Sequence, residues 1–456
     1  MARAASAGWL EYLLLHYRWV IVIFFLLPAS FFYDIYYYTR SWLVFRLSSA
    51  PRHHESRVKD VQRQVREWHA SGQDVPMCTA RPGWQTISFR EGAYKKKFYK
   101  VAINMVDILE IDICKMTVRC EPLVTMGQLT RALIDVGWTI PVVPEMDDLT
   151  IGGLVMGTGI ETSSHKMGLF QHTCVAYELV VADGSVIICS ENENRDLFYS
   201  VPWSYGTLGF LTAVEIKIIP AQRFVRVEYK PCYSLDSLVN TFTEETSRVD
   251  GNQFVEGIMY SLHSGVVMTA NMCTSAPLDQ DIIPFGNNVV FRYLLGWLVP
   301  PKVSLLKLTQ GQAIKELYEK NHFIQDMLVP LADLKEALGV FEKEVKIHPM
   351  WLCPFKLPAN PGMLHPLNGQ EALFVDIGTY GTPNVEGFDP TQTTRKIEEF
   401  VRKVKGFQMM YADSYMTREE YREMFDHSLY DKMREKLNCQ NAFPEVYDKV
   451  NRKARI

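Results

Sequence analysis

The sequence predicts an α+β fold with two subdomains behind one N-terminal transmembrane helix, and three observations lead to this prediction. Trp19 to Tyr33 is an apolar run without a charge. Residues from about 45 to 221 alternate short strands, glycine-bearing turns and short helices. Residues from about 222 onward contain strand-like runs separated by amphipathic helices. With 456 residues, the chain is long enough to bury at least one large core.

The composition excludes several classes of protein. The chain has 48 Lys and Arg against 52 Asp and Glu, so it lacks the basic excess that would neutralise nucleic acid phosphates. An apolar content of 47% excludes a disordered chain. The nine cysteines are scattered and form no Cys-x-x-Cys pair. We therefore expect no nucleic acid partner, no disulfide framework and no metal centre.

The first predicted element is the membrane helix, over residues 19–39. Its apolar stretch is about twenty residues long, which spans a hydrocarbon core of roughly 30 Å. Aromatic residues stand at both ends, as at membrane interfaces: Trp19, Tyr33, Tyr36, Tyr37 and Tyr38. The alternative is a cleaved signal peptide, because Arg18 precedes the run and Ala29-Ser30 follow it. The tyrosines and the lack of a small-x-small cleavage site favour a retained anchor.

The flanking charges predict how the anchor is oriented. Residues 1–18 carry Arg3 and Arg18, whereas the other flank carries Arg40, Arg46, Arg52, Arg57 and Lys59. The positive-inside rule then places everything after about residue 40 in the cytosol. The absence of any Asn-x-Ser/Thr glycosylation site agrees with that placement.

The remaining elements follow in chain order. Valines and Trp68 spaced three and four apart predict an amphipathic helix over residues 55–70. A helix over 126–136 should stop at Gly137. Asp183-Gly184 predicts a hairpin within 177–190, and a further strand covers 212–219. Beyond 222, strands are expected at 254–260, 265–270, 372–377 and 407–411, and a helix at 396–404.

The strongest chemical signal is the glycine-rich segment from Pro144 to Phe170. Glycines permit close backbone approach, so main-chain N–H groups and nearby hydroxyls can converge on a phosphate. His165 and Lys166 could add charge there. The named motifs fail, because a G-x-G-x-x-G would need glycine at Thr162 and no Walker lysine is present. A plain glycine-rich turn between two strands is the alternative interpretation.

Several motifs together resemble the FAD-binding domain of the vanillyl-alcohol-oxidase and para-cresol-methylhydroxylase superfamily, and in particular its sterol-reducing branch. They are Thr150–Thr162 with the following Ser-Ser-His-Lys, the Asp183-Gly184 hairpin, Asp196-Leu197-Phe198 and Gly206–Gly209. Further matches to the branch are residues 81–84, 121–128, 281–288, 411–413 and 442–449. The resemblance covers nearly the whole chain from about residue 17.

The resemblance implies a non-covalent FAD and a definite division of the chain. Residues 1–18 would be a flank, 19–39 the anchor and 45–221 the PCMH-type FAD-binding domain. Residues 222–425 would form an α/β cap that binds the substrate, and 426–456 would return to the FAD domain. Arg81-Pro82-Gly83 would offer a second backbone approach to the cofactor. The pyrophosphate would lie against Thr150, Ile151, Gly152, Gly153, Leu154, Val155, Met156, Gly157, Thr158, Gly159, Ile160, Glu161 and Thr162.

The implied reaction is the reduction of the Δ24 double bond in a sterol side chain, with NADPH as electron donor. An isolated alkene must also receive a proton, so a general acid is needed. The candidates are Tyr411, Asp413 and Tyr415, with His172 as a further one. Glu178 is expected instead to be structural, paired with a basic side chain. A sterol substrate also suits an enzyme in the endoplasmic reticulum membrane, or the Golgi membrane.

One departure from the branch concerns the cap. The family carries a longer aromatic and basic segment before Asp281, and this chain is shorter there. The apolar stretch 297–308 is a candidate for membrane contact or for the interior of the cap. Two alternatives therefore stay open: a flavin oxidase or dehydrogenase acting on an alcohol or lactone, and a shortened, catalytically impaired form with an interaction role.

Overall fold

The N-terminal part of the protein is helical. The computed structural model describes residues 9–47, 50–72, 75–82, 92–276, 290 and 311–454. Its first helices are α1 (Trp9–His16), α2 (Arg18–Ile21), α3 (Leu27–Arg46) and α4 (Ala50–Ala70), with a π-helical turn Val22–Leu26 between α2 and α3. Within the described part, one helix is long and apolar enough to cross a membrane, Arg18–Arg40, with a mean hydropathy of 1.8.

A five-stranded antiparallel sheet forms the centre of the first subdomain, residues 50–220. Its order is β3 (Ile108–Asp112), β4 (Thr117–Cys120), β8 (Phe210–Lys217), β6 (Cys174–Val180) and β7 (Val186–Ser190). Two small pairs accompany it, β1 (Met77–Thr79) with β2 (Tyr99–Val101) and β5 (Trp138–Thr139) with β9 (Ile219–Pro220). Its helices are α5 (Met126–Ile134), α6 (Ile151–Gly157), α7 (Ser164–Met167) and α8 (Arg195–Ser200).

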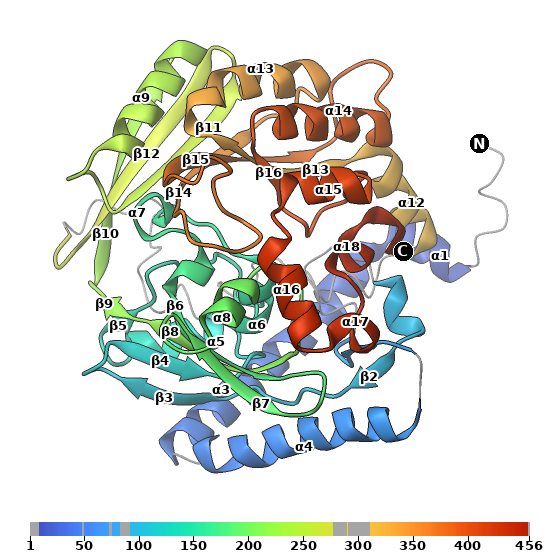
Figure 1. The fold of residues 1–456 in the computed structure, drawn as a ribbon. Coiled ribbons are helices and arrows are strands. Elements are labelled where there is room, and N and C mark those ends of the chain that lie inside the picture. Colours follow the sequence, from blue (N-terminus) through green and yellow to red (C-terminus); the bar gives the residue numbers. More distant parts are fainter. Residues whose placement is uncertain are drawn as a thin grey trace.

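A seven-stranded antiparallel sheet forms the second subdomain, residues 224–408. Its order is β10 (Phe224–Cys232), β12 (Ser264–Cys273), β11 (Phe254–Ser261), β14 (Met350–Leu357), β15 (Ala372–Gly381), β13 (Phe323–Pro330) and β16 (Phe407–Gln408). Helices α9 (Leu235–Ser247), α13 (Leu334–Glu344) and α14 (Pro390–Lys403) lie on its outer face, and the first subdomain lies on the other side (Figure 1). Helix α12 (Gln312–Asn321) precedes β13.

The C-terminal helices return to the first subdomain. They are α15 (Arg418–Met424), α16 (Ser428–Lys436), α17 (Cys439–Ala442) and α18 (Val446–Val450). The buried guanidinium of Arg434 donates to the carbonyl oxygen of Thr207 at 3.0 Å, and the hydroxyls of Tyr430 and Thr207 lie 2.6 Å apart. One continuous apolar core connects these helices with both sheets.

Local sequence signals explain several of these elements. The turn at Asp183-Gly184 joins β6 to β7, and Gly184 has a φ of +81°, which confirms the predicted hairpin. Helix α5 begins where Thr125 Oγ1 accepts from the amide of Gln128, and Gly137 follows its end with a φ of +82°. In α4, Val58, Val61, Val65 and Trp68 are buried, which confirms that amphipathic helix.

Two sequence interpretations need correction, and others fall outside the described residues. Within the segment for which a plain glycine-rich turn was the alternative interpretation, residues 151–157 form helix α6, which Thr150 Oγ1 caps by accepting from the amide of Gly153. The strand expected over 407–411 ends at Gln408, where pairing with β13 stops. The apolar stretch 297–308, most of the junction 273–290 and Gly83 lie outside the described residues.

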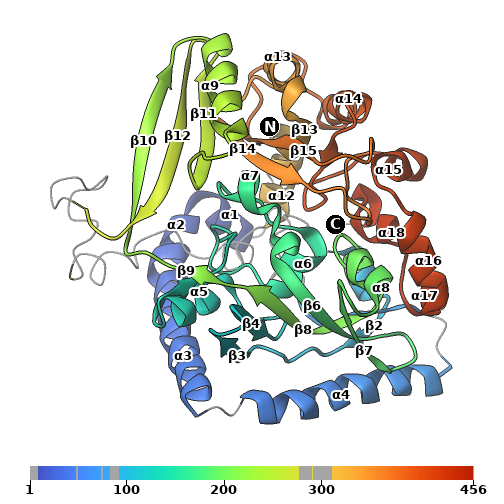
Figure 2. The same ribbon diagram turned by 60° about the vertical axis from the view of Figure 1, so that its left-hand side comes forward.

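Ion pairs to the buried Asp107 connect helices α3 and α4 to the first subdomain. Arg40 of α3 and Arg57 of α4 each lie 2.7 Å from the carboxylate of Asp107, which is 1% exposed. Arg57 also reaches Glu121 at 2.6 Å. Figure 2 shows α3 beside α5 and α4 beneath the five-stranded sheet. Burial opposes ionisation of Asp107, but the two guanidinium groups outweigh it and hold its pKa below the usual range.

Candidate active site

The glycine-rich segment lies where the two subdomains meet. The amide of Val255 on β11 donates to the carbonyl oxygen of Thr162 at 2.9 Å, and α7 packs against β14. The two charged residues after the glycines also face the second subdomain. His165 Nε2 lies 3.1 Å from the carbonyl oxygen of Asn252, and Lys166 donates to the carbonyl oxygen of Gly251.

Helix α6 presents an open glycine face. Gly153 is exposed, and a Cβ built there would meet only Thr150 Oγ1, at 3.2 Å. A Cβ on Gly157 would find Tyr205 at 3.5 Å as its nearest neighbour. Gly152 differs, since its Cβ would lie 2.9 Å from Pro122. The face formed by Gly153 and Gly157 therefore leaves room for a ligand to approach the backbone closely.

Strained backbone borders this glycine face. Thr158, directly after α6, has a φ of +87°, and in the adjoining loop Trp203 and Tyr205 have φ values of +64° and +52°. Non-glycine residues in this region cost of order 1–3 kcal/mol each and concentrate at functional sites. The two strained segments beside the open glycine face make this face the candidate ligand site.

Half-buried cations stand at the N-terminal side of the same helix. Arg81 donates to Thr150 Oγ1 at 3.0 Å, and Lys95 donates to the carbonyl oxygen of Arg81 at 2.6 Å. Lys449 of α18 donates to the carbonyl oxygen of Tyr205. Burial, with a smaller contribution from the charge of Lys95, lowers the pKa of Lys449 to about 8. Among the described residues, no carboxylate pairs with Lys95 or Lys449, so the donor set fits a bound anion such as a diphosphate.

Acidic and phenolic side chains cluster on the side of the seven-stranded sheet that faces the first subdomain. In β13 and β15, Asp326 pairs with Gly378 and Leu328 with Asp376, so both aspartates project from the face of the sheet that looks toward the first subdomain. Tyr411 donates to Asp326 Oδ2 at 2.7 Å, and Tyr380 donates to Oδ1. Both carboxylate oxygens of the fully buried Asp376 lack a hydrogen-bond partner among the described residues.

The sequence-predicted proton donors lie in different surroundings. Tyr411 is in the acidic cluster just described, whereas Asp413 lies 3.4 Å from Arg452 in an ion pair. The main chain of Tyr415 bonds to Arg395 and Glu398. His172 Nδ1 accepts from the amide of Leu169 at 2.9 Å, and burial lowers its pKa to about 4.

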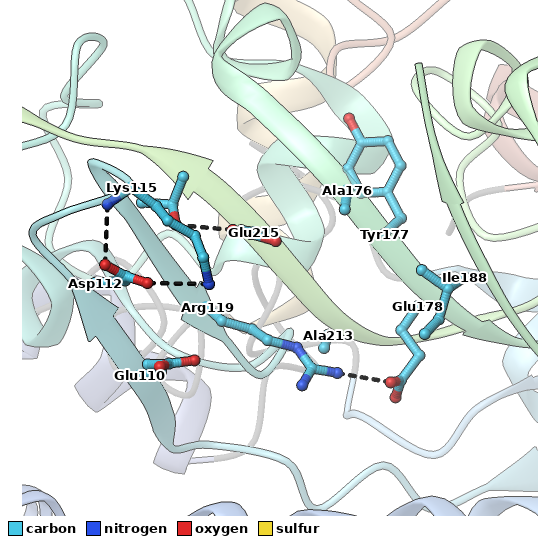
Figure 3. A pocket seen from close by; sticks show the side chains of 11 residues that line it. Glu110, Asp112, Lys115, Arg119, Ala176, Tyr177, Glu178, Ile188, Ala213 and Glu215 are labelled. Carbon is cyan, nitrogen blue, oxygen red and sulfur yellow. Dashed lines mark hydrogen bonds and ion pairs between the residues drawn. The ribbon is translucent and has the colours of Figure 1, made fainter. Parts of the chain in front are cut away.

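Glu178 has the structural role that the sequence predicts. It accepts from Arg119 at 2.7 Å and from Thr212 at 2.8 Å, and it lies 3.0 Å from His54. Burial opposes its ionisation, but these partners outweigh it and lower its pKa. Glu178 also borders a polar pocket of about 280 Å³ on the sheet face near α4 (Figure 3). Since charged side chains line that pocket, it does not suit a sterol.

Sequence reasoning missed the residues that the fold brings together. Lys95 and Lys449 are far apart in the chain and no motif links them. Asp326 and Asp376 did leave a signal, because each is the only charged residue of a mostly apolar strand, Phe323–Pro330 and Ala372–Gly381. A buried acid without a local partner is costly and commonly functional.

Comparison with known proteins shows the family of the chain. A family model described as an FAD binding domain matches residues 57–190. Delta(24)-sterol reductase of Homo sapiens is 53% identical over 98% of this chain and 96% of its own length. The chain belongs to the Delta(24)-sterol reductase family. The Delta(24)-sterol reductase homolog dhcr-24 of Caenorhabditis elegans is 41% identical over 98% of this chain and 96% of its own length. Delta(24)-sterol reductase of Pisum sativum is 35% identical over 97% of this chain and 92% of its own length.

Family membership confirms the resemblance and the FAD-binding fold of the first subdomain. The alignment with the human Delta(24)-sterol reductase extends over 494 positions, more than the 456 residues of this chain. The human protein therefore has residues without a counterpart here, as the sequence predicts. The segment before Asp281, where the shortage is expected, lies outside the described residues.

Proposed function

We propose that this protein reduces the Δ24 double bond of a sterol side chain, with FAD as cofactor and NADPH as electron donor. The observation that carries this proposal is 53% identity with the human Delta(24)-sterol reductase over nearly the whole chain. That level of similarity favours the reductase over an alcohol or lactone oxidase and over a role confined to protein interactions.

We propose that FAD is held by the segment Thr150–Thr162 and the cations beside it. The open face of Gly153 and Gly157 admits close approach of a ligand, and Arg81 donates to Thr150 Oγ1 beside that face. Lys95 and Lys449 offer positive charge without carboxylate partners from the described residues. Residues 45–221, with 426–456 returning to them, would form this FAD domain, and residues 222–425 would form the cap over the reacting end.

The reaction needs both a hydride and a proton. When bound, FAD accepts electrons from NADPH and supplies the hydride. The chain itself must orient the alkene, exclude water and provide the proton. Tyr411 is our candidate proton donor, because its hydroxyl is held by Asp326 on the face of the cap that looks toward the FAD domain. Asp413 and Tyr415 stay predicted alternatives.

We further propose a single-pass anchor, residues 19–39, in the endoplasmic reticulum membrane, with the catalytic domain in the cytosol; the Golgi membrane is the alternative location. The support is the apolar helix Arg18–Arg40, of which only 12% of the most apolar stretch is buried. A sterol is almost insoluble in water, so an enzyme anchored beside the bilayer can take its substrate from the lipid phase.

A conversion assay tests the proposed function. The detergent-solubilised full chain, supplied with FAD, NADPH and a Δ24-unsaturated sterol, should form the saturated sterol and consume NADPH in equal amounts. A flavin-loaded protein that turns over no Δ24-sterol would contradict the proposal. Peroxide formation from an alcohol or lactone without NADPH would show an oxidase instead.

A further inference from the structure

The side of the seven-stranded sheet that faces the FAD domain carries an unusual row of acids. Strand pairing places Cys353 opposite Asp376, and Trp351 opposite Gly378, which itself pairs with Asp326. Glu256 joins the row from β11, where it accepts from Trp351 Nε1 at 3.1 Å. Helix α9 covers the other side of this sheet, since a Cβ on Gly257 would meet Phe242 at 3.1 Å.

The two aspartates are diagonal neighbours on that side, a relationship that separates Cα atoms by roughly 7–8 Å in an antiparallel pair. Asp376 is fully buried, and no described group donates to either of its carboxylate oxygens. An ionised carboxylate in such a place costs several kcal/mol. Burial raises the pKa of Asp376 strongly, and the charge of Asp326 raises it further. Burial and the neighbouring charge therefore both favour the protonated form of Asp376.

Asp326 is the less buried aspartate of the pair. It is 7% exposed, and it accepts from Tyr411, which is half-buried, and from Tyr380, which is exposed. Gly378 makes this arrangement possible, because a Cβ there would lie 2.5 Å from the Tyr380 hydroxyl and 3.0 Å from Asp326 Oδ1. The four side chains thus run from the fully buried Asp376 to the exposed Tyr380.

The other titratable groups around the pair are acids, a thiol and phenols. They are Glu256 on β11, Cys353 on β14, Tyr380 on β15, Tyr411 after β16, and Glu145 and Glu161 from the first subdomain. Burial also raises the pKa of Glu161, to about 8; the charges of Glu145 and Glu256 act in the same direction, and the hydrogen bond from the backbone amide of Glu145 acts against it. Two carboxyl groups that interact in such surroundings titrate as a unit and retain one proton between them.

We propose that Asp326 and Asp376 form a carboxyl pair with one shared proton that resupplies Tyr411 during the reduction. When the shared proton lies on Asp326, the carboxyl donates to the Tyr411 oxygen, and the tyrosine's own hydrogen turns outward. The proposal rests on the proposed function. Tyr411 is the catalytic group, and the two aspartates are positioning residues that act through it.

The step balances as follows. One carbon of the alkene gains a hydride. FAD, once reduced by NADPH, would supply that hydride together with its electron pair. The Tyr411 O–H bond breaks while a C–H bond forms on the other carbon. The phenolate then takes the shared proton from Asp326, and water restores that proton to the pair after the product leaves. No further oxidant or reductant is required.

The test is the pH profile of sterol reduction by the FAD-loaded full chain. In Asp376→Asn, Asp326 loses its like-charged neighbour and ionises more easily. The alkaline limb of kcat should then move to lower pH by about one unit, and the rate at pH 8 should fall about tenfold. Reduction of the flavin by NADPH should stay unchanged. The matched control is Asp236→Asn, an exposed aspartate on α9 paired with Lys335.

Three outcomes decide the proposal. An Asp376→Asn enzyme with the unmutated rate and pH profile overturns it. If that variant loses its flavin or fails to fold, Asp326→Asn is tested instead. The alkaline limb of its kcat–pH profile should disappear, because the amide cannot lose a proton. An alkaline limb at the unmutated position overturns the proposal. If the unmutated protein turns over no Δ24-sterol, the proposed function fails first, and the carboxyl pair fails with it.

Discussion

The hydroxyl of Tyr411 lies 2.7 Å from Oδ2 of Asp326, across two segments that are far apart in the sequence. This contact joins a sequence-predicted proton donor to one of the buried aspartates of the seven-stranded sheet. It gives Tyr411 a role that Asp413, which lies 3.4 Å from Arg452, does not share.

Replacing Tyr411 by phenylalanine removes the hydroxyl and keeps the ring. We expect kcat for sterol reduction to fall about 100-fold or more, as for loss of a general acid. Flavin content and the rate of flavin reduction by NADPH should be unchanged, since neither needs this proton. The matched control is Tyr229→Phe on the exposed face of β10. Full activity in Tyr411→Phe would exclude it as the donor.

Two neighbouring glycines of α6 should respond differently to alanine. In Gly153→Ala, the new methyl would meet only Thr150 Oγ1, at 3.2 Å. The helix preference of alanine offsets this tight contact, so the stability of the apo protein should change by less than about 0.5 kcal/mol. FAD affinity should fall about tenfold, because the methyl occupies the face that the cofactor approaches. Thermal unfolding and flavin fluorescence measure the two effects.

Gly152→Ala serves as the comparison. Its methyl would clash with Pro122 rather than with a ligand, so the apo protein itself should lose stability. Unchanged FAD affinity in Gly153→Ala would show that the cofactor lies elsewhere.

The pKa of Lys449 predicts how FAD affinity depends on pH. Burial lowers that pKa to about 8 in the absence of ligand, and a bound diphosphate would raise it again. Binding therefore takes up a proton above pH 8, and FAD affinity should decrease as the pH rises through 8. Lys449→Met should bind FAD about tenfold more weakly at pH 7 and lose this pH dependence. Lys432→Met on α16, an exposed lysine paired with Asp196, is the control.

The ion pairs at Asp107 predict a strong coupling between the N-terminal helices and the first subdomain. In Asp107→Asn, Arg40 and Arg57 lose a buried partner, and unfolding should become easier by about 3 kcal/mol. Glu67→Gln, which affects an exposed pair with Arg63, should change stability by less than about 0.5 kcal/mol. Chemical denaturation in detergent measures both, and equal effects would contradict the assignment.

Glu420 should make stability depend on pH at the acid end. The hydrogen bond from Arg395 is the main cause that lowers its pKa to about 2. A carboxyl whose pKa is lower in the folded state stabilises the protein above its unfolded pKa, near 4.5, and loses this effect as the pH falls toward 2. Glu420→Gln should therefore lower the Tm at pH 7, and its difference from the unmutated protein should shrink below about pH 4.5. If the difference in Tm between Glu420→Gln and the unmutated protein grew as the pH fell, the pKa of Glu420 would not be lowered in the folded state.

Local signals predicted the elements whose shape depends on nearby residues. The Asp183-Gly184 hairpin and the end of α5 at Gly137 follow from backbone preferences of the residues themselves. Helix α6 was not predicted from the sequence, because its glycines are weak helix formers on their own. The cap at Thr150 and burial of Ile151 and Leu154 against the core stabilise it as a helix.

The sequence by itself determined the α+β class, the apolar N-terminal helix, the glycine-rich segment and the resemblance to a family of flavoproteins. All of these depend on contiguous residues or on short spacings. The tertiary structure decided which charges meet. Arg40 and Arg57, which count as orientation signals in the sequence, bind Asp107, and Asp326 meets Tyr411 beside the unpartnered Asp376. Burial and long-range pairing set the protonation of these groups, and neither can be read from a linear pattern.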